Sequence, residues 1–258
     1  MAETDTESEE VIMKLLVFNC SPNMDRGNTA LILQPFLEGA TEAGAEVEIL
    51  YSRKLDVKPC LGEYACWLKS PGVCLQHDDM REVLPKLKEA DAIVFAVPVY
   101  CDGVTGPMKN LMDRMIPIAE PFIEMRRGHC RHPARDGGKP KTFALISSCG
   151  FWETDNFKPM IVHMKAFCKN TNWRYVGALV RPHAGALKPM MEMGMKIDPI
   201  FAAARSAGGA FIKTGRIPRK YQRQVRRKLL PRFLYIQKAN EHFRQVLEKR
   251  DTNAASDS

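Results

Sequence analysis

Five short apolar segments recur along the 258-residue chain and predict five β-strands. They cover residues 12–19, 45–52, 91–100, 142–149 and 174–181. Most are near-continuous runs of Val, Ile, Leu and Phe, too short for a typical helix, which is the pattern of strands buried on both faces. Segment 45–52 instead alternates apolar and polar positions, the other pattern typical of strands.

Segments with helical periodicity separate these strands. The expected helices cover about 29–44, 78–90, 105–119, 155–170 and 199–213, whereas 59–74 and 120–140 are expected to be loops. Regular alternation of strand and helix predicts an α/β fold with a doubly wound parallel sheet. Five strands favour the flavodoxin-like version with strand order 2-1-3-4-5, in which ligands bind at the carboxyl ends of the strands.

The basic charge of the chain is concentrated toward its C-terminal end. Of a net charge of +8, residues 216–251 carry twelve Lys and Arg against three acids, so the rest is close to neutral. We therefore expect four parts: a disordered acidic tail at 1–10, a flavodoxin-like domain at 11–215, a basic helical extension at 216–251 and a disordered tail at 252–258. Apolar spacing predicts one or two amphipathic helices in the extension, interrupted at Pro231.

Three roles are open for the extension 216–251. Its basic face can contact an anionic membrane surface or nucleic acid. It can also pack on the body or on a partner subunit, which we favour because charge runs are usually solvated faces. The chain has no apolar run of the roughly 18 residues that a membrane span needs, and its acidic start is unlike a signal peptide. We therefore expect a cytoplasmic protein whose eight cysteines are reduced.

The loop after the first strand is rich in groups that bind phosphate. Residues 19–30, NCSPNMDRGNTA, leave a strand and enter a helix, whose free N–H groups and dipole attract an anion. The side chains that can donate to phosphate oxygens are Ser21, Asn23, Asn28 and Thr29. The absence of G-x-x-x-x-G-K-[ST] and G-x-G-x-x-G argues against a P-loop and a dinucleotide site. Helix capping by Ser21 and Asn28 is the alternative interpretation.

The loops after the third and fourth strands suit a flat ring. Gly103 and Gly106 allow close approach to the backbone, and Tyr100 offers a surface against which a ring can lie. The small residues Ser148 to Gly150 let the edge of a ligand come near the backbone. Within them, Cys149 is interpreted as a small buried residue rather than a nucleophile.

Together these loops resemble the motifs of the NAD(P)H-dependent FMN reductase family, which is flavodoxin-like in fold. The matching stretches are S-P-x(n)-G-N-T from Ser21, P-V-Y from Pro98 with a later L-M-D-R, and S-C-G-F from Ser148. By that resemblance the first loop holds the FMN phosphate through Ser21, Asn28 and Thr29, with Asn23 and Arg26 as lesser candidates. The resemblance places Pro98, Val99, Tyr100 and Gly103 to Gly106 against the isoalloxazine, and Ser148, Cys149 and Gly150 at the flavin edge.

The resemblance implies an FMN-dependent NAD(P)H oxidoreductase in which the flavin carries the chemistry and no side chain is catalytic. Hydride would pass from NAD(P)H to the flavin, and electrons on to a quinone, a free flavin or another small oxidant. A homodimer or tetramer is also implied, because this family usually completes its pocket across a subunit interface. Two alternatives remain: a flavodoxin-type electron carrier that takes no hydride, and a membrane- or nucleic-acid-associated flavoprotein acting through 216–251.

Three cysteines lie close together after the second strand, in PCLGEYACWLKSPGVC. The iron–sulfur branch of the same family holds a [4Fe–4S] cluster with four cysteines that begin C-x2-C-x2-C. Here Cys60, Cys66 and Cys74 match three positions, but Glu63 stands at the second, where a carboxylate is a poor cluster ligand.

The sequence also argues against a zinc site and against a disulfide at this loop. A zinc site that includes His77 lacks the usual ligand spacing, and a disulfide is unusual in a reducing compartment. We therefore expect a cluster-free branch with no metal at this loop, anchored by Trp67 and by residues 78–80.

Two further features are expected to be structural rather than catalytic or metal-binding. Asp113 and Arg114 are expected to form an ion pair on a helix surface. Four methionines between residues 182 and 198 are spaced like a copper site, but methionines in a flexible loop more often form an adaptable lid or interface. They are Met190, Met191, Met193 and Met195.

Overall fold

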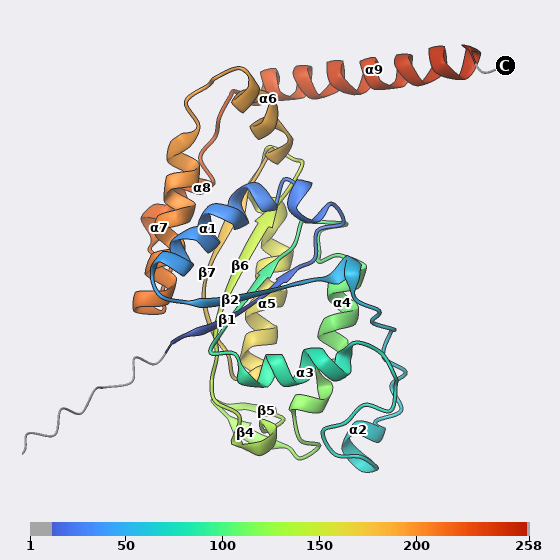
Figure 1. Cartoon of the computed structure of the whole chain (residues 1–258), viewed down its shortest axis with the longest axis vertical. Coiled ribbons are helices and arrows are strands. Elements are labelled where there is room, and N and C mark those ends of the chain that lie inside the picture. Colours follow the sequence, from blue (N-terminus) through green and yellow to red (C-terminus); the bar gives the residue numbers. More distant parts are fainter. Residues whose placement is uncertain (1–11, 257–258) are drawn as a thin grey trace, which may run out of the picture.

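The computed structural model describes residues 12–256, with side-chain detail as far as residue 250, and contains the expected parallel sheet (Figure 1). Its strands are β1 (Lys14–Asn19), β2 (Glu46–Tyr51), β3 (Ala92–Ala96), β6 (Thr142–Ser148) and β7 (Arg174–Arg181). Neighbouring strands pair in parallel in the order β2-β1-β3-β6-β7, which is the predicted 2-1-3-4-5 order. The flavodoxin-like prediction is confirmed, and the loops after β1, β3 and β6 leave from one edge of the sheet.

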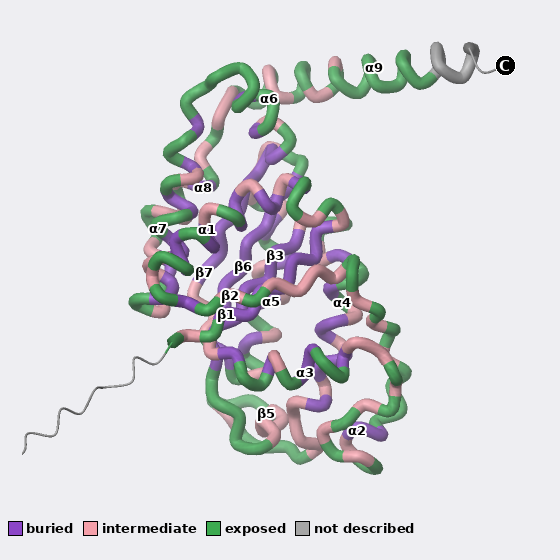
Figure 2. Tube along the Cα trace, in the orientation of Figure 1, coloured by how far each residue is buried: buried purple, intermediate pink, exposed green. Residues whose placement is uncertain are grey.

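Helices cover both faces of this sheet. One face carries α1 (Ala30–Glu42), α7 (Asp198–Thr214) and α8 (Arg219–Val225), and the other α3 (Met80–Glu89), α4 (Gly106–Asp113) and α5 (Lys158–Thr171). Side chains alternate along β1, because Leu15 and Val17 pack with α1 and α7 whereas Leu16 and Phe18 pack with α3 and α4. Burial on both faces explains the continuous apolar runs of the sequence (Figure 2).

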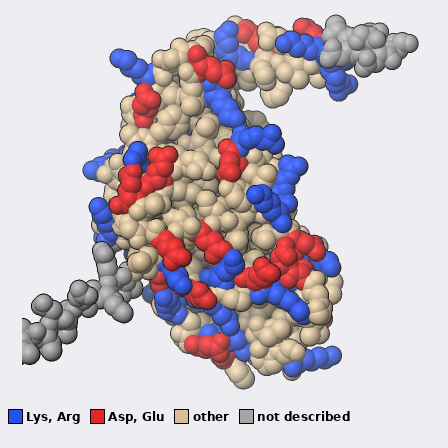
Figure 3. Space-filling view, in the orientation of Figure 1, with Lys and Arg blue, Asp and Glu red and all other residues tan. Residues whose placement is uncertain are grey.

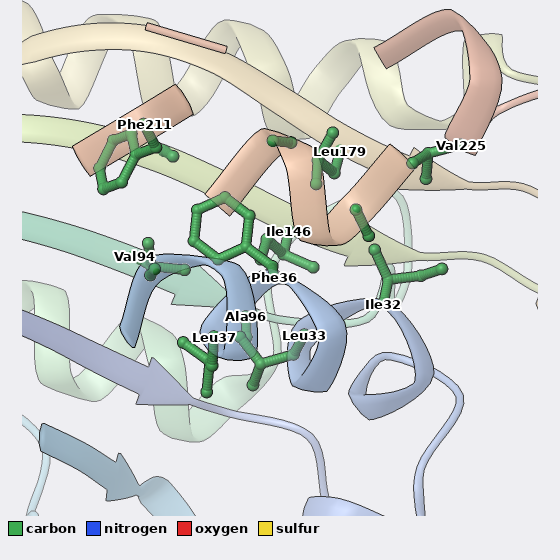
Figure 4. Close-up of a cluster of buried hydrophobic side chains, with 14 of the residues drawn as sticks. Ile32, Leu33, Phe36, Leu37, Val94, Ala96, Ile146, Leu179, Phe211 and Val225 are labelled. Carbon is green, nitrogen blue, oxygen red and sulfur yellow. The ribbon is translucent and has the colours of Figure 1, made fainter. Parts of the chain in front are cut away.

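Helices α1 and α7 are in contact at two glycines, one on each helix. A Cβ on Gly208 would lie 1.8 Å from the Phe36 carbonyl oxygen, and one on Gly39 would lie 1.9 Å from the Arg205 carbonyl oxygen. The two backbones therefore approach more closely than any side chain at these positions would allow. The rings of Phe36 and Phe211 pack beside this contact with centroids 5.7 Å apart (Figure 4).

Segment 120–140, expected to be a loop, contains a two-stranded hairpin. It is formed by β4 (Glu124–Arg126) and β5 (His129–Arg131), near the lower end of the view in Figure 1. Its turn residues, Arg127 and Gly128, have φ values of 53° and 77°, as a tight hairpin turn requires. Strands of three mostly polar residues carry no apolar periodicity, which is why the prediction was wrong here.

The helix expected at 105–119 is shorter than predicted. Helix α4 ends at Asp113, and a 3₁₀ turn follows at Ile116–Ile118. Indole Nε1 of Trp67, on the short helix α2 (Ala65–Leu68), donates to the carbonyl oxygens of Ile116 at 3.3 Å and Ala119 at 2.9 Å. The carbonyl groups around the turn are therefore bonded to the cysteine loop, as expected of an anchoring tryptophan.

The methionine segment contains a short helix, α6 (Leu187–Glu192). Met190 packs into the core beneath it, whereas Met191, Met193 and Met195 are 47%, 67% and 46% exposed. Their role as a lid or interface stays a prediction.

The C-terminal extension divides into two parts. Helix α8 packs against α7 and β7 with Val225 fully buried, whereas α9 (Arg232–Ser256) projects away from the body (Figure 1). The interruption falls at Pro231, as predicted. The expected disordered tail at 1–10 lies outside the described residues, as do residues 257–258 of the other tail. No helix within 12–256 is long and apolar enough to cross a membrane.

Candidate functional site

The end of β1 carries a buried asparagine with an unused hydrogen-bond donor. Asn19 is 1% exposed, and its Oδ1 accepts the Ser21 N–H at 3.2 Å. Its Nδ2 has no partner among the described residues, which is rare for a buried polar group. An orphaned donor at the carboxyl end of a strand can bind an acceptor atom of a ligand.

The start of α1 beside Asn19 has the form of an anion cradle. Ser21 and Thr29 are buried, and the N–H groups of Asn28 and Thr29 have no backbone acceptor in the described chain. A Cβ on Gly27 would stand 2.6 Å from Ser21 Oγ, so glycine lets the loop fold over this hydroxyl group. Free N–H groups at a helix start fit the phosphate that the sequence predicts here.

The cradle is braced by the last residue of β2, Tyr51, and by Arg53 just after the strand. The Tyr51 hydroxyl donates to the Asp25 carboxylate at 2.9 Å, and Arg53 donates to the Pro22 carbonyl oxygen at 2.9 Å. These bonds connect the loop after β1 to the end of β2 and the turn that follows it.

The remaining predicted phosphate residues lie at the rim of the cradle. Asn23 and Arg26 are exposed and Asn28 is half-buried. The ammonium group of Lys188, on α6, donates to the Arg26 carbonyl oxygen at 2.7 Å. Lys188 adds a positive charge beside the cradle that no motif marked.

The loop after β3 folds into a tight turn. Tyr100 and Gly103 exchange two backbone hydrogen bonds of 3.1 and 2.9 Å, and the residues between them, Cys101 and Asp102, have positive φ. This turn leaves Tyr100 51% exposed, so its side chain is accessible to a ring. Gly106 is exposed at the start of α4, where a Cβ would meet open space. The two residues before the turn, Pro98 and Val99, are half-buried.

The loop after β6 joins the other two loops. Ser148 Oγ lies 2.7 Å from Thr29 Oγ1, and the Ser148 carbonyl oxygen accepts the Val99 N–H at 2.9 Å. Next to it, Cys149 is 6% exposed, and burial raises the pKa of its thiol. A protonated thiol agrees with the interpretation of Cys149 as a small buried residue. Gly150 is exposed at the outer end of this loop.

A further contact between the loops was not predicted. Thr105 is 2% exposed and its hydroxyl donates to the Cys20 carbonyl oxygen at 3.1 Å, which ties the turn after β3 to the end of β1. A single threonine before a helix has no pattern that marks such a contact.

Part of the C-terminal extension lies on the same edge; we call residues 225–235 the strap. Arg181, fully buried at the end of β7, donates to the carbonyl oxygens of Val225 at 2.7 Å and Arg227 at 2.9 Å. It also lies 2.9 Å from Nε2 of the equally buried His183. Burial lowers the pKa of Arg181 to about 10, and these acceptors support its charge.

The strap also contacts the loop after β6. Trp152 Nε1 donates to the Leu230 carbonyl oxygen at 3.0 Å, and the Lys228 ammonium lies 3.8 Å from the centre of the indole ring. The Tyr235 hydroxyl donates to the Gly150 carbonyl oxygen. The strap therefore forms one flank of the candidate site. Sequence reasoning missed it because most of these contacts use backbone carbonyl groups, which leave no motif.

The three cysteines of the loop after β2 surround a very small cavity. With Glu63, they line about 10 Å³, roughly the space of one water. Burial, and then the neighbouring Cys74, Glu63 and Cys60, raise the pKa of the Cys66 thiol. Within residues 12–250, whose side chains the structure describes, no group of three or more His, Cys, Asp or Glu side chains is arranged to hold a metal ion. Three thiols and one carboxylate around this space do not fit a four-thiolate cluster.

Arg114 is not part of a surface ion pair, contrary to expectation. It is 1% exposed and binds the Asp78 carboxylate through two contacts of 2.5 and 2.9 Å, while Asp113 pairs with Lys109. Although burial disfavours charge on Asp78, hydrogen bonds from Arg114 and from the Lys58 N–H hold its pKa below the usual value. The buried pair anchors the cysteine loop, which is the role expected of residues 78–80.

Comparisons with known proteins agree with this geometry. The profile of the NADPH-dependent FMN reductase family matches residues 13–150, which include the three loops and just over half of the chain. An iron–sulfur flavoprotein of Archaeoglobus fulgidus is 46% identical over 102 residues, covering 40% of this chain and 48% of that protein. Another, of Methanocaldococcus jannaschii, is 39% identical over 106 residues, covering 41% and 53%.

A solved structure extends the likeness in fold. The FMN-dependent NADH-azoreductase of Bacillus anthracis, in complex with FMN, superposes with a TM-score of 0.57 at 16% identity, covering 78% of this chain and 100% of that one. The chain spans about half the length of the two curated relatives above. On the match to residues 13–150, this chain belongs to the NADPH-dependent FMN reductase family.

Proposed function

We propose that this protein is an FMN-dependent NAD(P)H oxidoreductase that passes electrons to a small oxidant such as a quinone or a free flavin. The observation that carries the proposal is the bonding of three loops on one sheet edge. Ser148 contacts both Thr29 and Val99, so a phosphate cradle, a ring surface and a ring edge share one rigid frame. Family membership and the FMN in the azoreductase structure support the same conclusion.

Residues of the three loops would bind different parts of FMN. Bound FMN would supply hydride uptake and electron release. Asn19, Ser21 and the start of α1 bind the phosphate, and Tyr100 supplies a surface for the ring. The backbone at Ser148–Gly150 lies at the ring edge. The strap contacts the loop after β6 at Trp152 and Gly150. We therefore propose that it belongs to the flavin-binding unit and that the part of α9 beyond residue 235 is the appendage.

The test is an absorption spectrum of the purified protein, followed by identification of the released cofactor. Anaerobic stopped-flow mixing with NADH and with NADPH should then bleach the flavin band, and a quinone should restore it. Bound FMN that neither nicotinamide bleaches would instead support a flavodoxin-type carrier. A protein that retains no flavin and binds no added FMN would overturn the site itself.

We also propose that the cysteine loop carries no cluster, although the two curated relatives described above are named as iron–sulfur flavoproteins. The carboxylate of Glu63 and the small space between the three thiols support this. We expect protein purified anaerobically to contain less than stoichiometric iron and acid-labile sulfide. The Glu63→Cys variant supplies the fourth thiol, and so tests whether the number of cysteine ligands is what prevents cluster binding. About four irons per chain in the unaltered protein would contradict the proposal.

We propose a homodimer or tetramer in solution, as expected for this family. Light scattering coupled to size exclusion measures the mass directly, and a monomer at micromolar concentration would contradict this proposal.

A further inference from the structure

A large cavity lies at the opposite edge of the sheet from the three loops. Its volume of about 580 Å³ is within the range of small-molecule sites. The walls come from the ends of α3 and α5, the β4–β5 hairpin, and the residues just before β6 and β7. These are the amino ends of the strands, so the seven residues of β6 separate the cavity from the candidate flavin site by roughly 20 Å.

The inner wall of the cavity is apolar and aromatic. Phe167 and Trp173 meet edge to face with centroids 5.4 Å apart, and Met112 and Met115 line the wall with them. Trp67 closes the side next to the cysteine loop. Aromatic rings bind flat aromatic ligands by stacking and edge contacts, and methionines adapt to their outline.

Basic residues exceed acidic ones around the cavity. Its lining includes Lys88, Arg131, Arg135, Lys139 and Lys141, and its one lining carboxylate belongs to Asp136. That carboxylate already pairs with Lys88 at 3.3 Å. The lining therefore carries an excess of positive charge, which favours an anionic ligand.

The cations around the cavity are not equally available. Lys139 pairs with Asp91, and Arg135 donates to two backbone carbonyl groups. Arg131 donates to the Cys130 carbonyl oxygen at 3.0 Å. Its cross-strand neighbour Glu124 pairs with Arg126 at 3.3 Å, and no carboxylate forms an ion pair with Arg131 among the residues that the structure describes. Its planar guanidinium can therefore still bind a carboxylate.

A buried lysine adds to this positive field. Lys141 is 6% exposed, and its ammonium donates to the carbonyl oxygens of Lys88, at 2.8 Å, and of Ala90, near the end of α3. Burial, and then neighbouring Lys139, lower the pKa of Lys141 to about 8. An anion in the cavity would favour the charged form of this group.

We propose that this cavity is a binding site for a small aromatic carboxylate, distinct from the flavin site. The ring lies against Phe167 and Trp173, and the carboxylate pairs with Arg131. The size, the aromatic wall and the unpaired guanidinium each point to this class of ligand. The site is independent of the proposed oxidoreductase activity, because no residue is shared with the three loops.

The first experiment is isothermal titration calorimetry of the purified full chain, with whatever cofactor it retains, using 2-naphthoate as the probe. The uncharged 2-naphthamide, of nearly the same shape, is the matched ligand. We expect one saturable site for naphthoate and binding at least about tenfold weaker for the amide, because a charged hydrogen bond is lost. Equal affinity for the two probes would overturn the assignment of an anionic ligand.

Variants place the binding in this cavity rather than at the flavin edge. Arg131→Gln should weaken naphthoate binding by about tenfold, and Ala134→Phe, which fills the cavity, should abolish it. Arg127→Gln, in the exposed turn of the same hairpin, is the matched control and should bind like the unaltered chain. Thermal unfolding shows whether each variant is folded. Naphthoate binding that is unchanged in Arg131→Gln would overturn the proposal, as would the absence of saturable binding.

Discussion

At the scale of single residues, Asn19 is the clearest departure from ordinary packing. An unsatisfied buried donor costs about 1–3 kcal/mol, which is recovered when a ligand accepts the bond. The cost falls on the protein with no ligand at this donor. We therefore expect ligand binding at the cradle to stabilise the fold through Asn19.

This predicts the effect of Asn19→Leu, which keeps the size and removes the donor. We expect FMN to bind about tenfold more weakly, because a hydrogen bond to an anionic phosphate is lost. Quenching of FMN fluorescence on titration with cofactor-free protein measures the affinity. Asn240→Leu, on the exposed part of α9, is the control and should bind FMN normally. If the two variants bind equally well, Asn19 does not contact the cofactor.

The buried His183 should make the free energy of unfolding depend on pH. Burial, and then Arg181 and Lys228, lower its pKa from the usual 6.5 to about 3, so the folded ring stays neutral where the unfolded ring takes up a proton. The contribution of His183 is complete above pH 6.5 and is lost as pH falls from there toward 3. It amounts to about 2 kcal/mol between pH 8 and pH 5.

Urea unfolding of the unaltered chain and of His183→Gln at both pH values tests this. The difference in unfolding free energy between pH 8 and pH 5 should be smaller in the variant by about that 2 kcal/mol. Glutamine keeps an acceptor near the Leu229 N–H, which now bonds to His183 Nε2 at 3.2 Å. A variant with the same pH dependence as the unaltered chain would show that His183 is not protected from protonation.

The candidate residues fall into two groups by how far sequence could predict them. Ser21, Thr29 and Ser148 were predictable because strand–loop–helix patterns and a family motif mark them. Asn19 and His183 were not, since a polar residue at a strand end signals nothing until its neighbours are known. The prediction for Arg114 was wrong because the sequence L-M-D-R is compatible both with an exposed helix face and with a buried ion pair to Asp78.

At the scale of elements, the contact between α1 and α7 determines how one face of the sheet is covered. Gly39 and Gly208 let the helices approach with backbone against backbone. Apolar side chains of both helices pack with residues of β3, β6 and β7 (Figure 4). The sequence showed both helices by periodicity. It did not show their spacing, because a glycine within a helix looks like a weakness until its partner is known.

The helix contact predicts a large effect of Gly208→Ala. Its Cβ would collide with the Phe36 carbonyl group, so we expect a loss of about 3 kcal/mol in unfolding free energy from overpacking. Gly209→Ala is the neighbouring control, since its Cβ would be 3.3 Å from the nearest atom and alanine favours the helix by about 1 kcal/mol. Chemical denaturation compares them. Equal stability of the two variants would contradict the close contact.

At the scale of the whole molecule, the strap and α9 behave differently. The body holds the strap: Arg181 and Trp152 donate to its backbone carbonyl groups, and Arg232, in the first turn of α9, pairs with Glu153 at 3.3 Å. On the face shown in Figure 3, positive and negative side chains are interspersed over the body and along α9. Both observations favour the packing role over a membrane or nucleic-acid surface. The positive charge of residues 216–251 was evident from the sequence, but the residues of the body that they contact were not.

Two truncations separate the strap from α9. A chain ending at residue 236 keeps the strap contacts described here, and we expect its unfolding free energy to be within about 0.5 kcal/mol of the full chain. A chain ending at residue 224 removes two carbonyl acceptors of Arg181, those of Val225 and Arg227, and should lose about 3 kcal/mol or more. Urea denaturation measures both. Equal stability of the two truncated chains would show that the strap contributes nothing to the fold.

The position of the strap in the chain has a consequence for the order of synthesis. The three loops are complete once residue 150 has left the ribosome, but the segment that flanks them is made some 75 residues later. Synthesis at about 5–20 residues per second therefore separates the residues of the three loops from those of their flank by several seconds. The flank is the last part of the candidate site to be made, after the strand β7 and the helix α7 of the same sheet fold.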